Sequence, residues 1–480
     1  MKRILMASSE AVPFAKTGGL ADVVGSLPYA FDKKKYDVRV IMPKYGSIPK
    51  EYTDQMNFIT HINVSLGWRN KYCGLFELDL NGVIFYFIDD EFYFGGQELY
   101  SYIHHDIEKF SFFSKAVLSI LPHLDFKPDI IHCNDWQTGL IPVFLKVLFQ
   151  KDELYHDIKT IMTIHNLKFQ GIWGLNETQD ATGLPEYVFT PDKLEFNNDS
   201  NLLKGGIVYA DHITTVSETY RDEIQTPYYG ESLDGLLRAR DNSLSGIING
   251  IDYELYNPST DEMIYAKYNS KDFPSKKEEN KVSLQEQLSL KVDKSAFMIG
   301  LISRLTDQKG LDLVTYIMDQ FADSDIQLVV LGTGEHKYEK MFQHYANDHQ
   351  DKISANITFS NELAHKIYAA SDAFLMPSLF EPCGLSQMIS MRYGTVPIVR
   401  ETGGLKDTVK PYNKYTGEGT GFTFINYNAD ELWDAIMRAR NIYKDKVEWN
   451  NIAKQAMAQD FSWKSSASKY ADLYSSLLDE

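Results

Sequence analysis

The amino-acid sequence predicts an α/β protein built from two doubly wound parallel sheets, and three observations support this fold class. Short apolar runs rich in β-branched residues alternate with segments of helical periodicity, a pattern typical of parallel sheets covered on both faces. These runs form two series that are separated by a charged segment. With 480 residues the chain is also too long for a single core, since domains mostly have roughly 100–200 residues.

The first series of expected strands and helices ends near residue 216. Residues 4–8 form the first expected strand, and the residues that follow at the spacing of one helix face are Leu20, Val23, Val24 and Leu27. Further strands are expected at residues 38–42, 83–88, 130–133, 160–164 and 213–216. This alternation predicts a Rossmann-like domain in the first half of the chain.

The second series predicts another domain of the same kind. Its strands are expected at residues 297–302, 327–331, 357–359, 373–376 and 396–399, with a helix over Val314, Ile317, Met318 and Phe321. A charged, poorly periodic stretch at 259–295 indicates a domain boundary in the region that precedes this series. We expect an N-terminal domain over residues 1–245, joined by the C-terminal helix 460–480, and a C-terminal domain over 246–459.

Composition and charge exclude several classes of function. Asp and Glu outnumber Lys and Arg by 66 to 48, and the net charge of −18 disfavours binding to nucleic acid. Three cysteines are too few for a disulfide framework and are typical of a reducing compartment. The apolar start ends too early for a signal peptide, and no run of about 18 apolar residues could span a membrane. We therefore expect a cytoplasmic protein with no nucleic-acid or membrane partner.

A first glycine-containing turn follows the first expected strand, at the sheet edge where α/β proteins bind ligands. Its sequence, Lys16-Thr17-Gly18-Gly19, matches neither the dinucleotide fingerprint nor the P-loop. A lysine, two glycines and a helix start nevertheless suit a diphosphate. The alternative is a tight turn with a surface lysine.

Two further turns carry charged residues after strands of the second series. Arg304 and Lys309 could neutralise a leaving diphosphate without a metal, and an arginine can hold phosphate oxygens bidentately. Glu381 could accept hydrogen bonds from sugar hydroxyls or stabilise an oxocarbenium ion. The alternatives are solvated surface cations for the first pair and a carboxylate that satisfies a helix dipole for the second turn.

Isolated polar residues complete the set. Asp135 and His165 each follow an expected strand, although a lone histidine is more often structural than catalytic. No His/Cys cluster has the spacing of metal ligands, and the chain lacks the nucleophile elbow of serine hydrolases. We therefore expect no metal site.

Taken together, these motifs resemble those of bacterial glycogen synthases and plant starch synthases, which are retaining glucosyltransferases of the GT-B fold. The resemblance runs from residue 4 to the final helix, and its main motifs are residues 16–20, Arg304 with Lys309, residues 381–385 and residues 402–405. It implies two Rossmann-like domains facing across a central cleft. It also implies transfer of glucose from ADP-glucose to the non-reducing end of an α-1,4-glucan such as glycogen, with retention of anomeric configuration and without a cofactor or metal.

The resemblance also assigns roles to individual residues. The catalytic positions match Glu381 beside the glucosyl ring, His165 near the donor sugar, and Arg304 and Lys309 on the diphosphate. The substrate-binding positions match Lys16, Gly18, Gly19, Asp22, Tyr100, Asp135, Asn249, Phe359, Cys383, Gly384, Leu385, Thr402, Gly403 and Gly404. Phe359 takes the place of a tyrosine that often stacks on adenine, so a ring is kept and a hydroxyl is lost. Ile389 replaces a second glutamate of many related transferases, as is common in these synthases.

Other functions remain open from the sequence. The chain could be a GT-B transferase that uses UDP-glucose or another acceptor, or a catalytically inactive glucan-binding protein. The presence of Lys16, Arg304, Lys309 and Glu381 disfavours an inactive protein. A phosphorylase would require a cofactor-bearing lysine in its own motif, and the sequence contains none.

Overall fold

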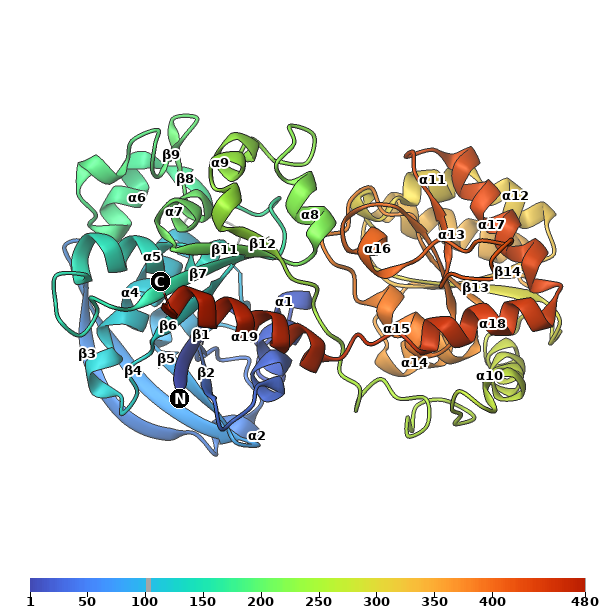
Figure 1. The fold of residues 1–480 in the computed structure, drawn as a ribbon, viewed down its shortest axis with the longest axis horizontal. Helices are drawn as coiled ribbons and strands as arrows, with labels where there is room; N and C mark the ends of the chain where they lie inside the picture. The colour runs from blue at the N-terminus through green and yellow to red at the C-terminus, as the bar shows by residue number, and fades with distance from the viewer. Residues whose placement is uncertain (101–104, 480) are drawn as a thin grey trace. The chain divides into compact units, whose positions relative to one another are not determined.

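A computed structural model describes residues 1–100 and 105–479, which divide into two compact units (Figure 1). Unit 1 contains Met1–Val216, Arg221–Gly250 and the segment that starts at Trp463. Unit 2 contains Ser217–Tyr220 and Ile251–Ser462. In the ranges described, no helix is both long enough and apolar enough to cross a membrane.

Unit 1 is organised around one large sheet with the strand order β12-β11-β7-β6-β1-β2-β5-β4-β3. The strands are β1 (Lys2–Ala7), β2 (Tyr36–Pro43), β3 (Asn57–Leu66), β4 (Arg69–Leu80), β5 (Val83–Asp89), β6 (Ile130–Asn134), β7 (Lys159–Ile164), β11 (His212–Thr215) and β12 (Leu244–Gly246). From β12 to β5 all neighbours are parallel, and β4 and β3 extend this edge in antiparallel fashion. The central strand β1 is apolar and buried along most of its length because both faces of the sheet are covered.

Helices surround the large sheet of unit 1, and a small second sheet packs against α6. The helices are α1 (Gly19–Ser26), α2 (Lys50–Thr53), α3 (Glu91–Phe94), α4 (His105–Ser119), α5 (Leu140–Phe144), α6 (Leu175–Thr182), α7 (Leu202–Tyr209), α8 (Glu218–Glu223), which begins in unit 2, and α9 (Asp234–Ala239). The small antiparallel sheet contains β8 (Ile172–Gly174), β10 (Asp199–Asn201) and β9 (Glu195–Phe196). Helix α4 buries Phe110, Phe112 and Phe113 completely, which places an aromatic layer in the core.

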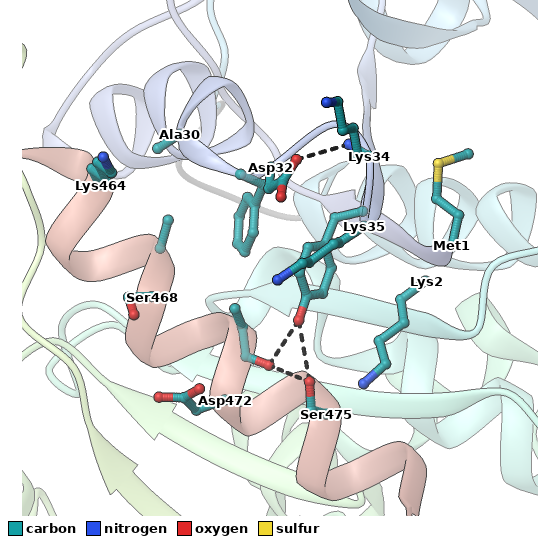
Figure 2. Close-up of a pocket in the computed structure, with 14 residues that line it drawn as sticks. Met1, Lys2, Ala30, Asp32, Lys34, Lys35, Lys464, Ser468, Asp472 and Ser475 are labelled. Carbon is teal, nitrogen blue, oxygen red and sulfur yellow. Dashed lines mark hydrogen bonds between the residues drawn. The ribbon is translucent and has the colours of Figure 1, made fainter.

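The last helix, α19 (Trp463–Asp479), packs on unit 1 (Figure 1). The Tyr474 hydroxyl lies 2.8 Å from Nδ1 of His132 on β6, and the Tyr36 hydroxyl donates to the carbonyl of Ala471 over 3.1 Å. A surface cavity of about 690 Å³ lies beside this helix and is lined also by Lys2 (Figure 2). Because Lys2 and Tyr36 begin their strands, this cavity lies at the amino edge of the sheet, whereas open α/β sheets bind ligands at the carboxyl edge.

Unit 2 contains a fully parallel sheet with the order β15-β14-β13-β16-β17-β18. Its strands are β13 (Phe297–Ile302), β14 (Ile326–Leu331), β15 (Ile353–Asn356), β16 (Ala373–Met376), β17 (Val396–Arg400) and β18 (Phe422–Phe424). Its helices are α10 (Phe273–Gln287), α11 (Leu311–Tyr316), α12 (Met318–Asp323), α13 (His336–Asp348), α14 (Asn361–Ala370), α15 (Ser386–Arg392), α16 (Gly403–Thr408), α17 (Ala429–Tyr443) and α18 (Lys446–Met457). Apolar strands alternating with helices produce the doubly wound fold that the sequence predicts.

The charged stretch at 259–295 lies within the expected C-terminal domain over 246–459, and it carries a helix that its composition did not predict. It belongs to unit 2 and contains α10, which packs against α14. Two of its lysines are buried: Lys281 forms a 2.6 Å ion pair with Asp372, and Lys277 donates to Thr395 Oγ1 over 2.7 Å. Because charged side chains provide part of the buried face of α10, apolar periodicity could not reveal this helix.

Two other elements of unit 2 differ from the sequence expectation. The single helix expected through Ile317 is two helices, α11 and α12, because Ile317 leaves helical geometry at φ −102° and ψ 8° while remaining buried. The strand expected at 357–359 is β15, which ends at Asn356. Ile353 is its buried residue and pairs with Leu328 of β14, so Phe359 lies three positions beyond the strand.

The large sheet of unit 1 and the sheet of unit 2 each reverse their strand order at one point. Numbered along the chain, the strands of unit 2 have the order 3-2-1-4-5-6, and the parallel strands of unit 1 follow the same order with one more strand at the end. The reversal falls between β1 and β6 in unit 1 and between β13 and β16 in unit 2. Ligands of open α/β sheets bind outside the carboxyl ends of the strands at such switch points.

Candidate active site

The loop that follows β1 carries the first predicted turn and lies at the switch point of unit 1. Glu10, three residues after β1, accepts hydrogen bonds from the Thr17 amide (2.5 Å) and the Thr17 hydroxyl (2.8 Å). Gly18 precedes α1, and a Cβ added there would meet no atom within 4 Å. The fold of unit 1 therefore leaves open space beside Gly18, as close approach of a ligand to this backbone would require.

Lys16 and Asp22, both predicted to bind substrate, contact each other. The Lys16 ammonium lies 2.7 Å from Asp22 Oδ1, and both side chains reach solvent. An exposed pair of this kind contributes about 0–1 kcal/mol to stability. The ammonium can therefore leave Asp22 for an anionic ligand at little cost.

Asp135 and His165 come together beyond the ends of β6 and β7. Asp135 adopts a positive φ of 57°, and its Oδ1 accepts the backbone amide hydrogen of His165 over 2.8 Å. Nε2 of His165 lies 2.9 Å from Asn134 Oδ1, which places the ring proton on Nε2. Burial lowers the pKa of His165 to about 3, so the ring is neutral at physiological pH.

The carboxyl group of Asp135 has the opposite shift. Burial, assisted by the nearby charge of Glu10, raises the pKa of Asp135 to about 7 although backbone amides oppose the shift. Near neutral pH this group is a mixture of carboxylate and carboxylic acid. It can therefore either accept a hydrogen bond from a sugar hydroxyl or donate one.

Tyr100 and Asn249 are the remaining predicted residues of unit 1. The Tyr100 hydroxyl donates to Glu10 Oε1 over 2.8 Å and lies 2.9 Å from Ser9 Oγ, so this residue joins the loop after β1. Asn249 follows β12, and its buried Oδ1 has no hydrogen-bond partner within the ranges described. A buried acceptor without a partner costs about 1–3 kcal/mol, which a ligand donor would relieve.

In unit 2 the structure brings Lys309 and Glu381 together at the switch point. Glu381 follows β16 and is almost fully buried. Its Oε2 accepts hydrogen bonds from the Lys309 ammonium at 2.7 Å and from Ser378 Oγ at 3.0 Å. Gly310, at φ 70°, permits the close approach of the Lys309 turn to Pro377, because a Cβ there would lie 2.0 Å from the Pro377 carbonyl oxygen.

Arg304 and Phe359 lie at the carboxyl ends of β13 and β15 with exposed side chains. Phe359 is 82% exposed. In the described part of unit 2, no hydrogen bond or ion pair of its side chain holds Arg304 to the Lys309–Glu381 pair. Both residues can therefore turn toward a ligand.

The remaining predicted residues of unit 2 form two turns that pack against each other, one at Cys383, Gly384 and Leu385 and one at Thr402, Gly403 and Gly404. A Cβ at Gly403 would lie 2.0 Å from the Glu381 carbonyl oxygen, and a Cβ at Gly404 would lie 2.0 Å from the Cys383 carbonyl oxygen. The Gly404 amide donates to the Glu381 carbonyl over 3.1 Å. These glycines thus have a packing role that fixes the Glu381 backbone, while their predicted contacts with substrate stay predictions.

Three residues that support the site were not among the predicted ones. Glu10 holds the Lys16 turn, Ser378 holds Glu381, and the buried Arg400 donates to the Leu379 carbonyl over 2.6 Å in the same loop. Glu10 and Ser378 stand two or three residues past a strand end, a position that could have drawn attention to them. Within the described ranges, no three His, Cys, Asp or Glu side chains are grouped closely enough to hold a metal ion.

Comparison with known proteins identifies the two halves of the chain. A family model for the starch synthase catalytic domain matches residues 3–239, and one for group 1 glycosyl transferases matches residues 285–456. A structure of the catalytic domain of starch synthase IV from Arabidopsis thaliana, bound to ADP and acarbose, superimposes with a TM-score of 0.91 at 33% identity. The superposition covers 100% of this chain and 99% of the starch synthase IV chain. The fold and site thus define a glycosyltransferase of the GT-B class with two Rossmann-like domains.

Full-length relatives narrow this class. The glycogen synthase of Lachnospira eligens is 65% identical over 99% of this chain and 100% of its own length. The glycogen synthase of Lachnoclostridium phytofermentans is 60% identical with the same coverage. The chain therefore belongs to the glycogen synthase family.

Proposed function

We propose that this protein transfers glucose from ADP-glucose to the non-reducing end of an α-1,4-glucan, with retention of anomeric configuration. One observation carries the proposal: a buried glutamate, Glu381, is held by Lys309 at the ligand edge of a Rossmann-like sheet. ADP as the nucleotide is supported by the ADP bound to the starch synthase IV structure, and glycogen synthesis by the names of the full-length relatives.

The chemistry requires no covalent intermediate on the protein. The bond between C1 of glucose and the β-phosphate oxygen breaks, with the electron pair leaving on the diphosphate. The acceptor 4-hydroxyl forms the new bond to C1 on the same face, and its proton passes to the departing phosphate oxygen. The protein then needs only to position the reactants and neutralise charge.

Residues of unit 2 suit the charged part of this reaction. Arg304 and Lys309 supply two cations for the leaving diphosphate, and the anchoring of Lys309 on Glu381 removes part of the cost of ordering its side chain. Glu381 supplies negative charge for the oxocarbenium ion that develops at C1. Because cations provide the neutralisation, we propose that catalysis requires no metal ion.

Residues of unit 1 suit recognition of the sugar and the phosphates. The neutral His165 and the partly protonated Asp135 can exchange hydrogen bonds with glucosyl hydroxyls. Lys16 can pair with a phosphate in exchange for Asp22. We propose that Lys16 and Lys309 each contribute to use of the donor, so that Lys16→Ala and Lys309→Ala should each raise the KM or lower the kcat for ADP-glucose.

The test is release of nucleoside diphosphate in the presence of glycogen, with ADP-glucose and UDP-glucose compared at equal concentration. We expect higher kcat/KM with ADP-glucose, and NMR of the elongated glucan should show only α-linked product. A preference for UDP-glucose would identify another donor, and no turnover with either would indicate an inactive glucan-binding protein. Loss of activity in excess EDTA, restored by a divalent metal, would contradict the metal-free mechanism.

A further inference from the structure

Glu10 contacts two segments of unit 1 that are predicted to bind substrate. Its Oε2 accepts hydrogen bonds from the amides of Thr17 (2.5 Å) and Gly18 (3.4 Å). Its Oε1 accepts hydrogen bonds from the Thr17 hydroxyl and the Tyr100 hydroxyl, each at 2.8 Å. One carboxylate thus joins the turn that carries Lys16 to a residue 90 positions away.

The setting of Glu10 is unfavourable for a carboxylate with only a structural role. The residue is 3% exposed, and no cation pairs with it in the ranges described. A buried charge without a counter-ion costs stability even when it is hydrogen-bonded. Groups that lower stability in this way are commonly kept at functional sites.

The position of Glu10 connects it to the proposed reaction. It lies three residues past β1, beside the switch point, and it fixes the backbone directly after Lys16 and directly before α1. A lysine on a mobile loop would lose much of its side-chain and backbone freedom on binding a phosphate. A turn that is already held in place avoids that loss.

We propose that Glu10 is a positioning residue for glucosyl transfer, holding the turn at Thr17 and Gly18 and the Tyr100 hydroxyl so that Lys16 meets the donor diphosphate. This inference rests on the proposed function. Glu10 does not itself touch the reacting atoms and is not a catalytic residue.

Glu10→Gln is the variant that separates positioning from folding. Glutamine has the same shape, and its oxygen can keep the Thr17 and Gly18 amides. Its NH2 group then faces the Thr17 and Tyr100 hydroxyls, which must reverse from donors to acceptors, and the turn loses its charge-assisted hydrogen bonds. We expect kcat/KM for ADP-glucose to fall by about 100-fold, mainly through KM, as for a displaced binding group. The melting temperature should fall by only a few degrees.

Asp211→Asn provides a matched control at the opposite edge of the sheet. Asp211 Oδ2 accepts from the Thr160 amide (2.7 Å) and the Thr160 hydroxyl (2.9 Å), just as Glu10 accepts from Thr17. This contact lies at the amino end of β7, away from the ligand edge. We expect Asp211→Asn to lower the melting temperature at least as much as Glu10→Gln and to leave kcat/KM within about 2-fold of the parent.

A double-mutant cycle with Lys16 completes the test. If Glu10 acts through Lys16, then Lys16→Ala should lower kcat/KM much less in the Glu10→Gln background than in the parent. A full-sized Lys16→Ala effect in that background, or kinetic constants of Glu10→Gln within 2-fold of the parent, would overturn the proposal.

Failure of the proposed function gives a different result. The kinetics are run on ADP-glucose and on UDP-glucose, and a parent enzyme that uses only the second donor still allows the comparison. If the parent uses neither donor, amide hydrogen exchange of the full chain tests the contact. Faster exchange at Thr17 and Gly18 in Glu10→Gln, but not in Asp211→Asn, supports the positioning contact, and unchanged exchange rejects it.

Discussion

Replacing Glu381 by glutamine isolates the charge of this residue from its shape. The carboxylate accepts hydrogen bonds from Lys309 (2.7 Å) and Ser378 (3.0 Å), both on Oε2. The glutamine oxygen can accept the same two bonds, so the loop after β16 should keep its conformation. What disappears is one negative charge at the carboxyl edge of the sheet.

The expected loss of turnover follows from the size of that charge. One unit charge at about 4 Å from a developing positive centre contributes about 4 kcal/mol at an effective dielectric constant of about 20. This corresponds to about 10³ in rate, the same order as the loss of one preorganised electrostatic contact in enzymes. We therefore expect kcat to fall by about 10² to 10³, with a smaller change in KM.

The expected loss of stability is much smaller. A neutral oxygen replaces a charged one in two hydrogen bonds, which costs about 1–2 kcal/mol. For a domain of about 200 residues each 1 kcal/mol lowers Tm by about 2–4 °C. The variant should thus remain folded at assay temperature.

Asp372→Asn is the matched control for Glu381→Gln. Asp372 forms a 2.6 Å ion pair with the buried Lys281 just before β16, whereas Glu381 pairs with Lys309 after the same strand. The assay is initial-rate release of ADP with glycogen as acceptor, together with Tm by differential scanning calorimetry. We expect the control to lower Tm at least as much while retaining most of its turnover. Turnover of Glu381→Gln within 3-fold of the parent, or equal losses in the two variants, would refute a catalytic charge at position 381.

Two further predictions concern stability. Burial lowers the pKa of His132 and His165 to about 3, so the unfolded chain takes up their protons first as pH falls below 6.5, and the free energy of unfolding decreases. The pKa of Asp135 is raised to about 7 and acts in the opposite direction, because the folded chain takes up that proton first. Because two histidines oppose one aspartate, the free energy of unfolding measured with urea should be about 1 kcal/mol lower at pH 5 than at pH 6. In His132→Gln this difference should vanish, and an unchanged difference would contradict the prediction. Gly403→Ala should cost more than 2 kcal/mol, roughly, because it combines a φ of 45° with a 2.0 Å approach to the Glu381 carbonyl. Gly417→Ala, at φ 71° with its nearest atom 3.9 Å away, should cost only about 1 kcal/mol, and equal unfolding midpoints would show that the overlap at Gly403 is relieved.

Most of the fold could be predicted because its signals are local. The apolar runs that became β1, β13 and β14 are strands in sheets covered on both faces, and such strands are apolar along most of their length whatever their partners. The charged helix α10 could not be predicted in this way. Its buried lysines are satisfied by Asp372 and by main-chain carbonyls from other elements, which local periodicity does not record.

The candidate site was likewise predictable in part. The residues at strand ends, such as Lys16, His165, Arg304 and Glu381, could be located from the sequence, because the carboxyl ends of parallel strands are where such a fold binds ligands. The protonation state of these residues and their pairing with other side chains could not be predicted from the sequence. The neutral ring of His165 results from burial, and the pair of Lys309 with Glu381 joins residues 72 positions apart.

The order of residue types along the chain was enough to predict the fold class, the strand ends that carry the candidate site residues, and the family that the chain resembles. Three-dimensional contacts were needed to show that Glu10 holds the Lys16 turn, that Gly403 and Gly404 leave room for the Glu381 loop, and that buried lysines stabilise α10. Hydrogen bonding, close packing and desolvation depend on distances in space between segments far apart in the chain, and those distances exist only once the sheets have formed.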